Sequence, residues 1–417
     1  MRVLFLNPTG RIGGAETALL EMLAGLREAQ PRWSFELVVA SEGPLVGRAA
    51  ALGVAVHVLP FPRRLAAVGE WGRRRGVWPR LRLAASLARA VRPARAYARR
   101  LGLLLQERAP DVVHTNGLKM HLLGARARPE GAALLWHVHD YVGTRPVTSR
   151  LLRRAAAACS AVVANSESVA ADLRRVVGNA LTVEPLWNAV DLRRFSPIGP
   201  RYDLDDLAGL SPADEGVIRA GLVATFARWK GHRVFLQALA KVPASAAVRG
   251  YIIGGPVYAT PDSQVSLEAL AREVDALGLG GRVGFTGFVE DPAPAIRALD
   301  IVVHASTDPE PFGLVIAEAM ACGKAVIASE AGGAAEIVTP GVNALTHRPG
   351  DAEGLAHAMA TLAADPVRRR RLGAAGRATA EQSFGRRRLA GELARIYRRL
   401  AGARGEPFSL PHTGRPA

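Results

Sequence analysis

Short apolar segments alternate with amphipathic stretches along most of this chain, and this alternation is the strongest constraint on its fold. Each apolar run has the length of a strand rather than of a helix. Strands that are apolar on both faces and separated by helices form parallel sheets covered on both sides. The sequence therefore predicts an α/β fold.

The alternation occurs in two series. The predicted strands of the first series are 3–6, 35–40, 54–59, 112–114, 134–138, 162–164 and 181–184, with helices such as 15–28 and 84–105 between them. Two prolines and a turn-forming asparagine between Pro185 and Pro197 then indicate a linker. The second series has predicted strands at 222–226, 251–253, 283–286, 301–304, 325–328 and 344–346.

Two series of similar size predict two doubly wound, Rossmann-like domains, and 417 residues are too many for one core. We expect the domains at 1–190 and 191–383, a last helix at 384–401 that could pack back on the first domain, and a flexible tail at 402–417. Ligands of such sheets bind beyond the carboxyl ends of the strands. Two sheets with these edges opposed would face each other across a deep cleft.

Cysteine content and hydropathy limit the possible classes of protein. Cys159 and Cys322, the two cysteines of the chain, lie in apolar segments, which predicts reduced core thiols and excludes a disulfide scaffold. The first residues read as a strand rather than as a signal peptide, and no run of eighteen residues is apolar without a charge. We therefore expect a cytoplasmic protein.

The net charge of +17 is concentrated in one segment. Between Pro62 and Ala109 there are thirteen arginines against two glutamates, with Trp71 and Trp78 among them. Such a segment suits peripheral contact with an anionic membrane or an anionic acceptor. A solvated helical face is the alternative. Because no nucleic-acid-binding motif accompanies the charge, we expect no nucleic-acid partner.

The most informative motif follows the predicted strand that ends near Ser306. It runs from Asp308 to Ser329 and contains Glu310 and Glu318, with a helix predicted to begin around Phe312. The amides of Gly313 and Leu314 would point out of the helix N-terminus, where a phosphate is favoured. Carboxylates on either side of a phosphate site suit the hydroxyl pairs of a sugar and a ribose. Ordinary helix capping by acidic residues is the alternative.

This motif resembles that of the family 4 glycosyltransferases, in which two glutamates are separated by seven residues within a Pro-Phe-Gly and Glu-Ala-Met-Ala-Cys-Gly context. The resemblance implies a GT-B fold, a nucleotide-sugar donor and transfer with retention at the anomeric carbon. It also implies that Glu310 contacts the donor sugar and Glu318 the ribose. We expect Ser306 and Phe312, at the same loop, to bind the donor as well. The resemblance extends from Met1 to about Leu400 and is sharper after Asn188. It implies that the first domain binds the acceptor and the second domain the nucleotide-sugar donor.

Two glycine pairs agree with this resemblance. Gly13 and Gly14 follow the first strand, and glycines let the backbone approach a phosphate closely. By its position after the first strand, this turn resembles the loop of family 4 glycosyltransferases that reaches the donor diphosphate. Gly332 and Gly333 resemble a glycine-rich loop near the donor, which ends in Glu336 at the start of a helix.

Arg228 and Lys230 follow the first strand of the second series and can neutralise a leaving diphosphate. The family arginine stands five positions before the lysine, where this chain has Thr225. Either a short deletion moves Arg228 into that role or the role is absent. Since no Asp-x-Asp cluster follows a strand, we expect no metal and no other cofactor.

Histidines end two predicted strands of the first domain. His137 and His139 alternate along one strand and therefore share a face. The family often carries a histidine here, near the acceptor, which favours His139 as a catalytic residue. His114 ends the preceding strand and is a second candidate for substrate contact, although either histidine could be structural.

The sequence as a whole predicts transfer of a sugar from a nucleoside-diphosphate sugar to a hydroxyl acceptor. The acceptor could be a glycan, a small molecule or a lipid-linked saccharide of cell-envelope polysaccharide synthesis. A phosphorylase or epimerase on the same fold, and a nucleotide-sugar-binding scaffold, are the alternatives. The motifs do not identify the donor base, the sugar or the acceptor.

Overall fold

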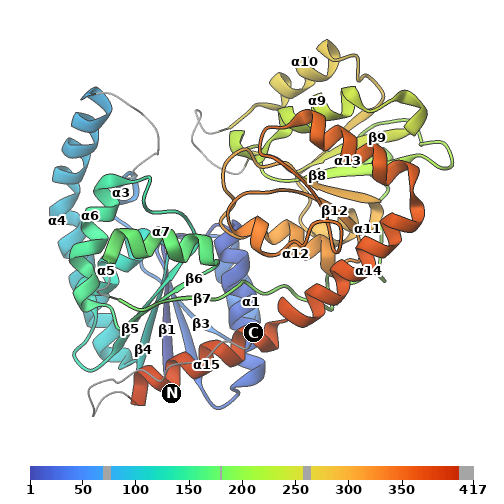
Figure 1. The fold of residues 1–417 in the computed structure, drawn as a ribbon. Helices are drawn as coiled ribbons and strands as arrows, with labels where there is room; N and C mark the ends of the chain where they lie inside the picture. Colours follow the sequence, from blue (N-terminus) through green and yellow to red (C-terminus); the bar gives the residue numbers. More distant parts are fainter. Residues whose placement is uncertain (69–76, 179–180, 257–263, 403–417) are drawn as a thin grey trace. The chain divides into compact units, whose positions relative to one another are not determined.

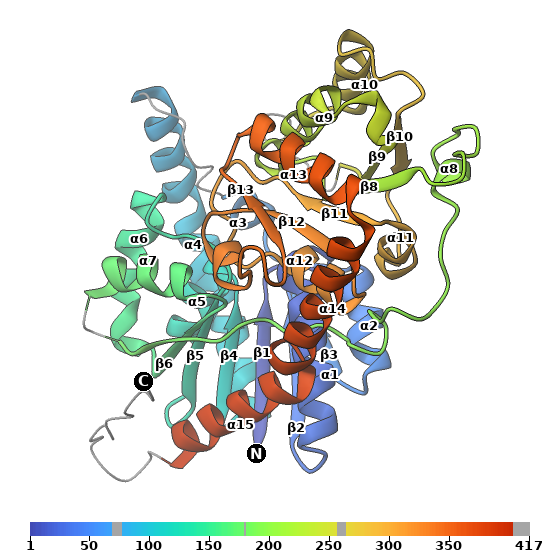
Figure 2. The same cartoon turned by 45° about the vertical axis from the view of Figure 1, so that its right-hand side comes forward.

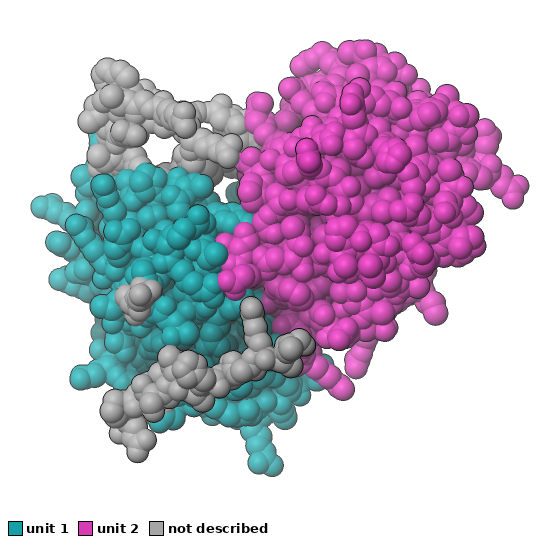
Figure 3. Space-filling view, in the orientation of Figure 1, with its two compact units in different colours: residues 1–164, 170–186, 389–417 teal, residues 165–169, 187–388 magenta. Residues whose placement is uncertain are grey.

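The computed structural model describes residues 1–68, 77–178, 181–256 and 264–402, without the side chains of 77–84. The chain divides into two compact units, coloured separately in Figure 3. Unit 1 comprises 1–164, 170–186 and the chain from Leu389, and unit 2 comprises 165–169 and 187–388. The unit boundaries at Leu186 and Arg388 lie within a few residues of the expected domain ends at 190 and 383.

Unit 1 is built on a seven-stranded parallel sheet with the order β3-β2-β1-β4-β5-β6-β7. Every strand pair is parallel, and Val3, for example, is in register with Phe35 on one side and Val112 on the other. The strands are β1 Arg2–Asn7, β2 Ser34–Val39, β3 Ala55–Val58, β4 Val112–Asn116, β5 Ala133–Val138, β6 Ala161–Ala164 and β7 Val183–Pro185.

Helices cover this sheet, and the last helix of the chain joins them. The helices that precede it are α1 Gly14–Ala29, α2 Pro44–Ala51, α3 Arg63–Ala66, α4 Val77–Arg108, α5 Leu118–Ala127, α6 Pro146–Ala155 and α7 Glu167–Val177. Most of α15, Arg386–Gly402, runs along unit 1 (Figure 1). Its Tyr397 is fully buried, and Arg395 lies 3.3 Å from Glu184 of β7. Tertiary packing therefore places α15 on the domain that is formed by the first part of the chain.

Unit 2 repeats this plan with a six-stranded parallel sheet in the order β10-β9-β8-β11-β12-β13. Alternate residues of its strands enter two different cores: Val303 lies in one and Val302 in the other. Both faces are therefore buried, as parallel strands require. The strands are β8 Ile218–Val223, β9 Val248–Ile253, β10 Val283–Gly287, β11 Ile301–His304, β12 Ala325–Ser329 and β13 Leu345–His347.

The helices of unit 2 divide between these two cores. One face of the sheet is covered by α9 His232–Lys241, α10 Leu267–Ala276 and α13 Ala352–Ala364. The other face is covered by α11 Pro292–Ala298, α12 Leu314–Ala321 and α14 Pro366–Ser383 (Figure 2). A short helix, α8 Leu204–Leu207, precedes the first strand. In both units the first strand lies between the second and fourth, which is the strand order of a dinucleotide-binding fold.

The structure corrects one predicted strand. The strand expected at 222–226 lies earlier, because β8 ends at Val223 and the buried Phe226 belongs to the following loop. The helix expected to begin around Phe312 is confirmed: it begins at Leu314 and ends at Ala321, two residues before Gly323. Trp71 and the tail from 403 lie outside the described residues, as does the side chain of Trp78.

Both cysteines are buried and free, which confirms their expected role as core thiols. Among the helices that the structure describes, none combines the length and the apolar character needed to cross a membrane.

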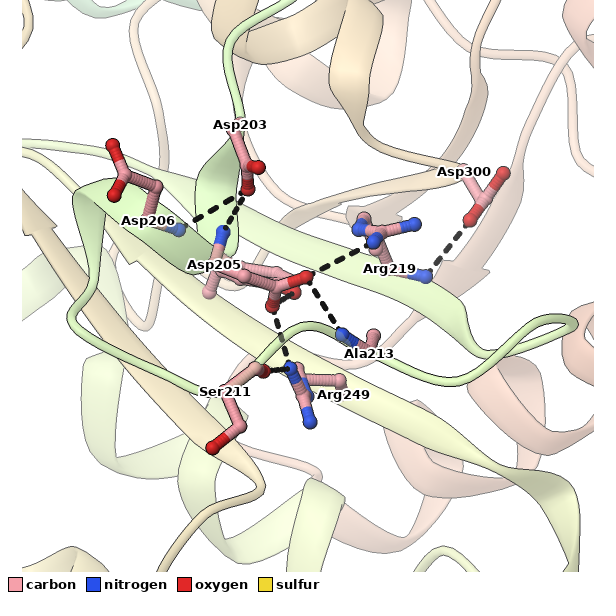
Figure 4. Close-up of polar contacts among 9 residues, drawn as sticks. Asp203, Asp205, Asp206, Ser211, Ala213, Arg219, Arg249 and Asp300 are labelled. Atoms are coloured by element: carbon pink, nitrogen blue, oxygen red, sulfur yellow. Dashed lines mark hydrogen bonds and ion pairs between the residues drawn. The ribbon is translucent and has the colours of Figure 1, made fainter.

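A buried carboxylate ties α8 to the sheet of unit 2 (Figure 4). Asp205 is 3% exposed and lies 3.0 Å from Arg219 of β8 and 2.6 Å from Arg249 of β9. It also accepts hydrogen bonds from the Tyr251 hydroxyl at 2.5 Å and the Ala213 amide at 3.1 Å. Burial alone would raise the pKa of Asp205, but these donors hold it well below its usual value. The segment before β8 is thereby anchored at the amino ends of β8 and β9.

We expect Asp205→Ala to lower the free energy of unfolding by about 3 kcal/mol, because it leaves two arginines without their shared partner. Asp206→Ala is the matched control on the same helix, since Asp206 is exposed, and it should change stability by no more than about 0.5 kcal/mol. Urea unfolding of both variants measures the difference. Equal stabilities would contradict an anchoring role for Asp205.

Candidate active site

Two loops meet at the carboxyl edge of the unit 2 sheet, where the strand order changes direction. One loop follows β8 and carries Lys230, and the other follows β11 and carries Glu310. This is the position at which open α/β sheets bind ligands. The Lys230 ammonium nitrogen lies 2.9 and 2.7 Å from the two carboxylate oxygens of Glu310. The structure thus brings together two residues that the sequence separates by 80 positions.

Glu310 is held by further contacts. The Ser306 hydroxyl donates to Glu310 Oε2 at 2.9 Å, and His304 Nε2 lies 3.4 Å from the same oxygen. Burial by itself would raise the pKa of Glu310, but the Lys230 ammonium and the His304 imidazole keep it well below the usual value. Glu310 is therefore an ionised carboxylate with a fixed orientation.

His304 is a site residue that the sequence analysis missed. It is the last residue of β11, is 4% exposed, and contacts both Glu310 and the hydroxyl of Ser306. The available signal was its position, because polar residues at the carboxyl end of a parallel strand face the ligand edge.

The two glycines of the 331–333 turn position the Glu310 loop. The Gly333 amide donates to the Glu310 carbonyl at 2.7 Å, and the Glu310 amide donates to the Ala331 carbonyl at 3.3 Å. A Cβ on Gly333 would lie 2.1 Å from the Pro311 carbonyl oxygen. Gly332 has φ of 68° and ψ of −148°, a conformation open to glycine. The structure therefore gives Gly332 and Gly333 a positioning role for this loop.

Helix α12 begins immediately after the Glu310 loop. Gly313 has φ of 94° and precedes the helix, and no side chain caps its N-terminus. The amides of the first turn, starting with Leu314, lack intrahelical acceptors and form the positive end of the helix dipole. The side chain of Phe312 does not contribute, because it is 2% exposed and packs edge-on against Phe384. This corrects the expectation that Phe312 contacts the donor through its side chain.

The remaining predicted residues of unit 2 differ in their surroundings. Glu318 lies within α12 and is 7% exposed. Arg228 is exposed and belongs, with Lys230, to the 3₁₀ helix η3 (Arg228–Lys230). It borders a pocket that neither Lys230 nor Glu310 lines. Glu336 accepts hydrogen bonds from the amides of Glu167 and Ser168 at 2.9 and 2.6 Å, so it caps the first residues of α7, which belong to unit 2.

In unit 1, the glycine pair lies at the start of α1, beyond the carboxyl end of β1. Gly13 is the N-cap, and its amide donates to Glu16 at 3.1 Å. A Cβ on Gly14 would meet no atom within 4 Å, and one on Gly13 would meet only the Glu16 carboxylate. Internal packing therefore does not require these glycines, which is compatible with the predicted approach of a ligand to the backbone.

The histidines of unit 1 separate into two environments. His139 is the first residue after β5, partly buried, and its ring centroid lies 4.1 Å from that of His137, which confirms their shared face. Burial lowers the pKa of His139 to about 4, so its imidazole is neutral at pH 7. The neutral ring can accept a proton, as a residue near a reacting hydroxyl would need to do.

His114 is instead a core residue. It is fully buried, its Nδ1 lies 2.6 Å from the Tyr397 hydroxyl, and its Nε2 lies 3.3 Å from His137 Nδ1. Burial and the nearby imidazoles lower its pKa well below the usual value. Because both ring nitrogens have partners inside unit 1, the structure argues against the predicted substrate contact of His114.

The geometry of unit 2 defines a class of protein. A lysine, an oriented carboxylate and a helix N-terminus converge at the switch point of a nucleotide-binding sheet, which suits a group-transfer enzyme with a phosphate-bearing substrate. The Glycosyltransferase Family 4 model matches residues 12–194, and the Glycosyl transferases group 1 model matches residues 218–365. The chain belongs to the family 4 glycosyltransferases.

Two curated relatives illustrate this membership. The chain is 30% identical over 300 residues to the GDP-mannose-dependent alpha-(1-6)-phosphatidylinositol monomannoside mannosyltransferase of Mycolicibacterium smegmatis, covering 68% of this chain and 74% of that relative. It is 35% identical over 249 residues to a D-inositol 3-phosphate glycosyltransferase of Xylanimonas cellulosilytica, covering 58% of this chain. That match spans 57% of the relative, just over half of its length.

A solved structure covers nearly the whole chain. Anabaena HepE in complex with UDP-glucose has 26% sequence identity and a TM-score of 0.76, covering 96% of this chain and 100% of that one. This likeness confirms the predicted GT-B fold, which consists of two parallel-sheet α/β domains.

Proposed function

We propose that this protein is a retaining glycosyltransferase that moves a sugar from a nucleoside-diphosphate sugar to a hydroxyl acceptor. The observation that carries the proposal is the Lys230–Glu310 pair beside the N-terminus of α12. A cation and a helix end can together hold a diphosphate, and an oriented carboxylate can accept hydrogen bonds from sugar hydroxyls.

The site residues of unit 2 then have the following chemical roles. Lys230 stabilises the negative charge that grows on the leaving diphosphate, and the amides of Gly313 and Leu314 add hydrogen bonds. Glu310, fixed by Ser306 and His304, orients the donor sugar. Glu318 is the proposed partner of the ribose.

We propose a same-face substitution as the retaining mechanism. The bond from the anomeric carbon to the diphosphate oxygen breaks, the acceptor oxygen bonds to the same face, and the departing phosphate oxygen takes the hydroxyl proton. Glu310 does not serve as a nucleophile in this scheme, because a same-face substitution forms no covalent glycosyl-enzyme intermediate. In unit 1, we propose that His139 contacts the acceptor and that Gly13 and Gly14 contact the donor phosphates.

The comparisons support a nucleoside-diphosphate sugar as the class of donor, but they do not select one sugar or one base. HepE is seen with UDP-glucose, and the Mycolicibacterium smegmatis relative is named as GDP-mannose-dependent. A panel of UDP-, GDP- and ADP-sugars in a thermal-shift screen separates these donors. Release of free nucleoside diphosphate distinguishes transfer from phosphorolysis, from epimerisation and from binding without reaction.

We also propose that the enzyme acts at the cytoplasmic face of a membrane, on an anionic or lipid-linked acceptor of envelope polysaccharide synthesis. The supporting feature is α4, whose described part exposes five arginines: Arg89, Arg92, Arg95, Arg99 and Arg100. Leu103 on the same helix is 67% exposed, so apolar surface accompanies the charge. Both features favour binding to an anionic bilayer surface.

Lys230→Ala should lower turnover about 100- to 1000-fold, because the leaving diphosphate loses its cation. Glu310→Gln should also lower turnover strongly, and Lys230→Arg should restore part of the activity. Lys241→Ala is the control, since Lys241 forms an exposed pair with Glu353 at 3.1 Å. Nucleoside diphosphate release and melting temperature are measured together. Near-normal turnover of a folded Lys230→Ala protein would contradict the proposed role.

Divalent metal should not be required for transfer, because Lys230 and the α12 N-terminus supply the positive charge. Turnover measured in EDTA is then expected to equal turnover measured with added Mg²⁺. A chelator-dependent loss that Mg²⁺ restores would show that the charge of these groups is insufficient.

Replacement of Arg92, Arg95 and Arg99 by glutamate should weaken binding to vesicles containing phosphatidylglycerol by at least about 100-fold. The control reverses Arg370 and Arg371, two exposed arginines of α14, and should bind like the unaltered protein. Vesicle co-sedimentation measures both. Equal binding of the unaltered protein to neutral and anionic vesicles would remove the basis for membrane contact.

A further inference from the structure

A pocket with a mixed polar and apolar lining lies next to the Lys230 loop in unit 2. It has a volume of about 220 Å³ and lies at the start of α9, between η3 and Val265. Arg228, His232, Arg233 and Thr307 contribute its polar groups. Its volume exceeds that of several waters at about 30 Å³ each, so a phosphate or carboxylate group fits.

The backbone at this pocket presents the positive end of a ten-residue helix. Gly231, with φ of 73°, precedes α9, and a Cβ there would lie 1.8 Å from the Ala305 carbonyl oxygen. No side chain caps the helix, and its first amides have no intrahelical acceptor. This end of α9 therefore favours an anion.

His232 provides the independent evidence for a ligand. It is 1% exposed and lines the pocket, yet neither ring nitrogen has a hydrogen-bond partner among the residues that the structure describes. Burial and the nearby Lys230 ammonium lower the pKa of His232 to about 4, so at pH 7 the ring is neutral and carries one N–H donor. A buried donor without a partner is costly, and an oxyanion in the pocket would satisfy it.

The charges around the pocket also favour an anion. Arg228 is exposed, and the structure gives its guanidinium no carboxylate partner within the described part of the chain. Arg233 is 57% exposed and lies 3.1 Å from Glu273 of α10, which offsets part of its charge. The positive groups at the pocket, two guanidinium groups and a helix N-terminus, therefore outnumber the one carboxylate, Glu273.

We propose that this pocket binds the phosphate or carboxylate group of an acidic acceptor. The acceptor is favoured over the donor because Lys230 and Glu310, the groups assigned to the donor, do not line the pocket. The assignment to an acceptor rests on the proposed function, whereas the binding of an oxyanion rests on the pocket alone. Arg228 then serves the acceptor, and the role of the family arginine aligned with Thr225 is not filled by it.

Inorganic phosphate is the probe, and the full chain with ¹⁵N-labelled histidine is the sample. The His232 signal, assigned with His232→Gln, should shift and saturate as phosphate is added. Arg228→Gln should weaken the phosphate affinity about tenfold or more, as expected for one charge-assisted hydrogen bond. Arg371→Gln, an exposed arginine on α14, should leave the affinity unchanged. An unshifted His232 signal, or equal affinities of the two arginine variants, would overturn the proposal.

A second titration separates this pocket from the donor site. With UDP-glucose or GDP-mannose at saturation, phosphate should still shift the His232 signal with an unchanged affinity. Competition between donor and phosphate would overturn the assignment to an acceptor. If phosphate binds while none of the nucleotide sugars does, the proposed glycosyltransferase function fails and the anion pocket stands.

Discussion

The fixed carboxylate of Glu310 is the interaction on which the arrangement of unit 2 depends. A buried carboxylate needs a cation and hydrogen-bond donors, and Lys230 and Ser306 from two loops and His304 from the end of β11 supply them. Those loops can meet because β8 and β11 are neighbours in the sheet, although their first residues, Ile218 and Ile301, are 83 positions apart in the sequence. The strand order thus brings the charges together, and the charges in turn fix the conformation of the loops.

The sequence was sufficient for the parts of the structure that depend on local pattern. Apolar runs bounded by amphipathic stretches located the strands, and the Glu310–Glu318 motif located a loop followed by a helix. These features are encoded within a few residues of each other, because an apolar run and the residues that begin a helix are both local patterns in the sequence. The strand expected at 222–226 lies earlier in the structure. Phe226 is a buried loop residue, and apolar character alone does not distinguish a buried loop residue from a strand residue.

The features that sequence reasoning did not find depend on distant partners. His114 ends a strand as a ligand-binding histidine would, yet Tyr397 from the last helix occupies one of its ring nitrogens. Phe312 lies within the motif, yet its ring packs against Phe384. Asp205 is one of several acidic residues in a polar stretch, and its role becomes visible when β8 and β9 bring Arg219 and Arg249 to it. Pattern indicates which edge of a sheet a residue occupies, whereas tertiary packing decides its contacts.

Lys230 acts electrostatically on both the donor site and the anion pocket proposed for unit 2. Its ammonium keeps Glu310 ionised on one side, and on the other its charge helps to keep His232 neutral. A diphosphate that draws Lys230 away from Glu310 would leave that carboxylate to accept sugar hydroxyls, since a buried carboxylate needs donors to replace the ones it loses. Donor binding would thereby exchange one set of hydrogen bonds for another at the same edge. Arg228, two residues earlier in the same 3₁₀ helix, lines the separate anion pocket. One short 3₁₀ helix can therefore contribute to the binding of two anions, the donor diphosphate and the acidic group of the acceptor.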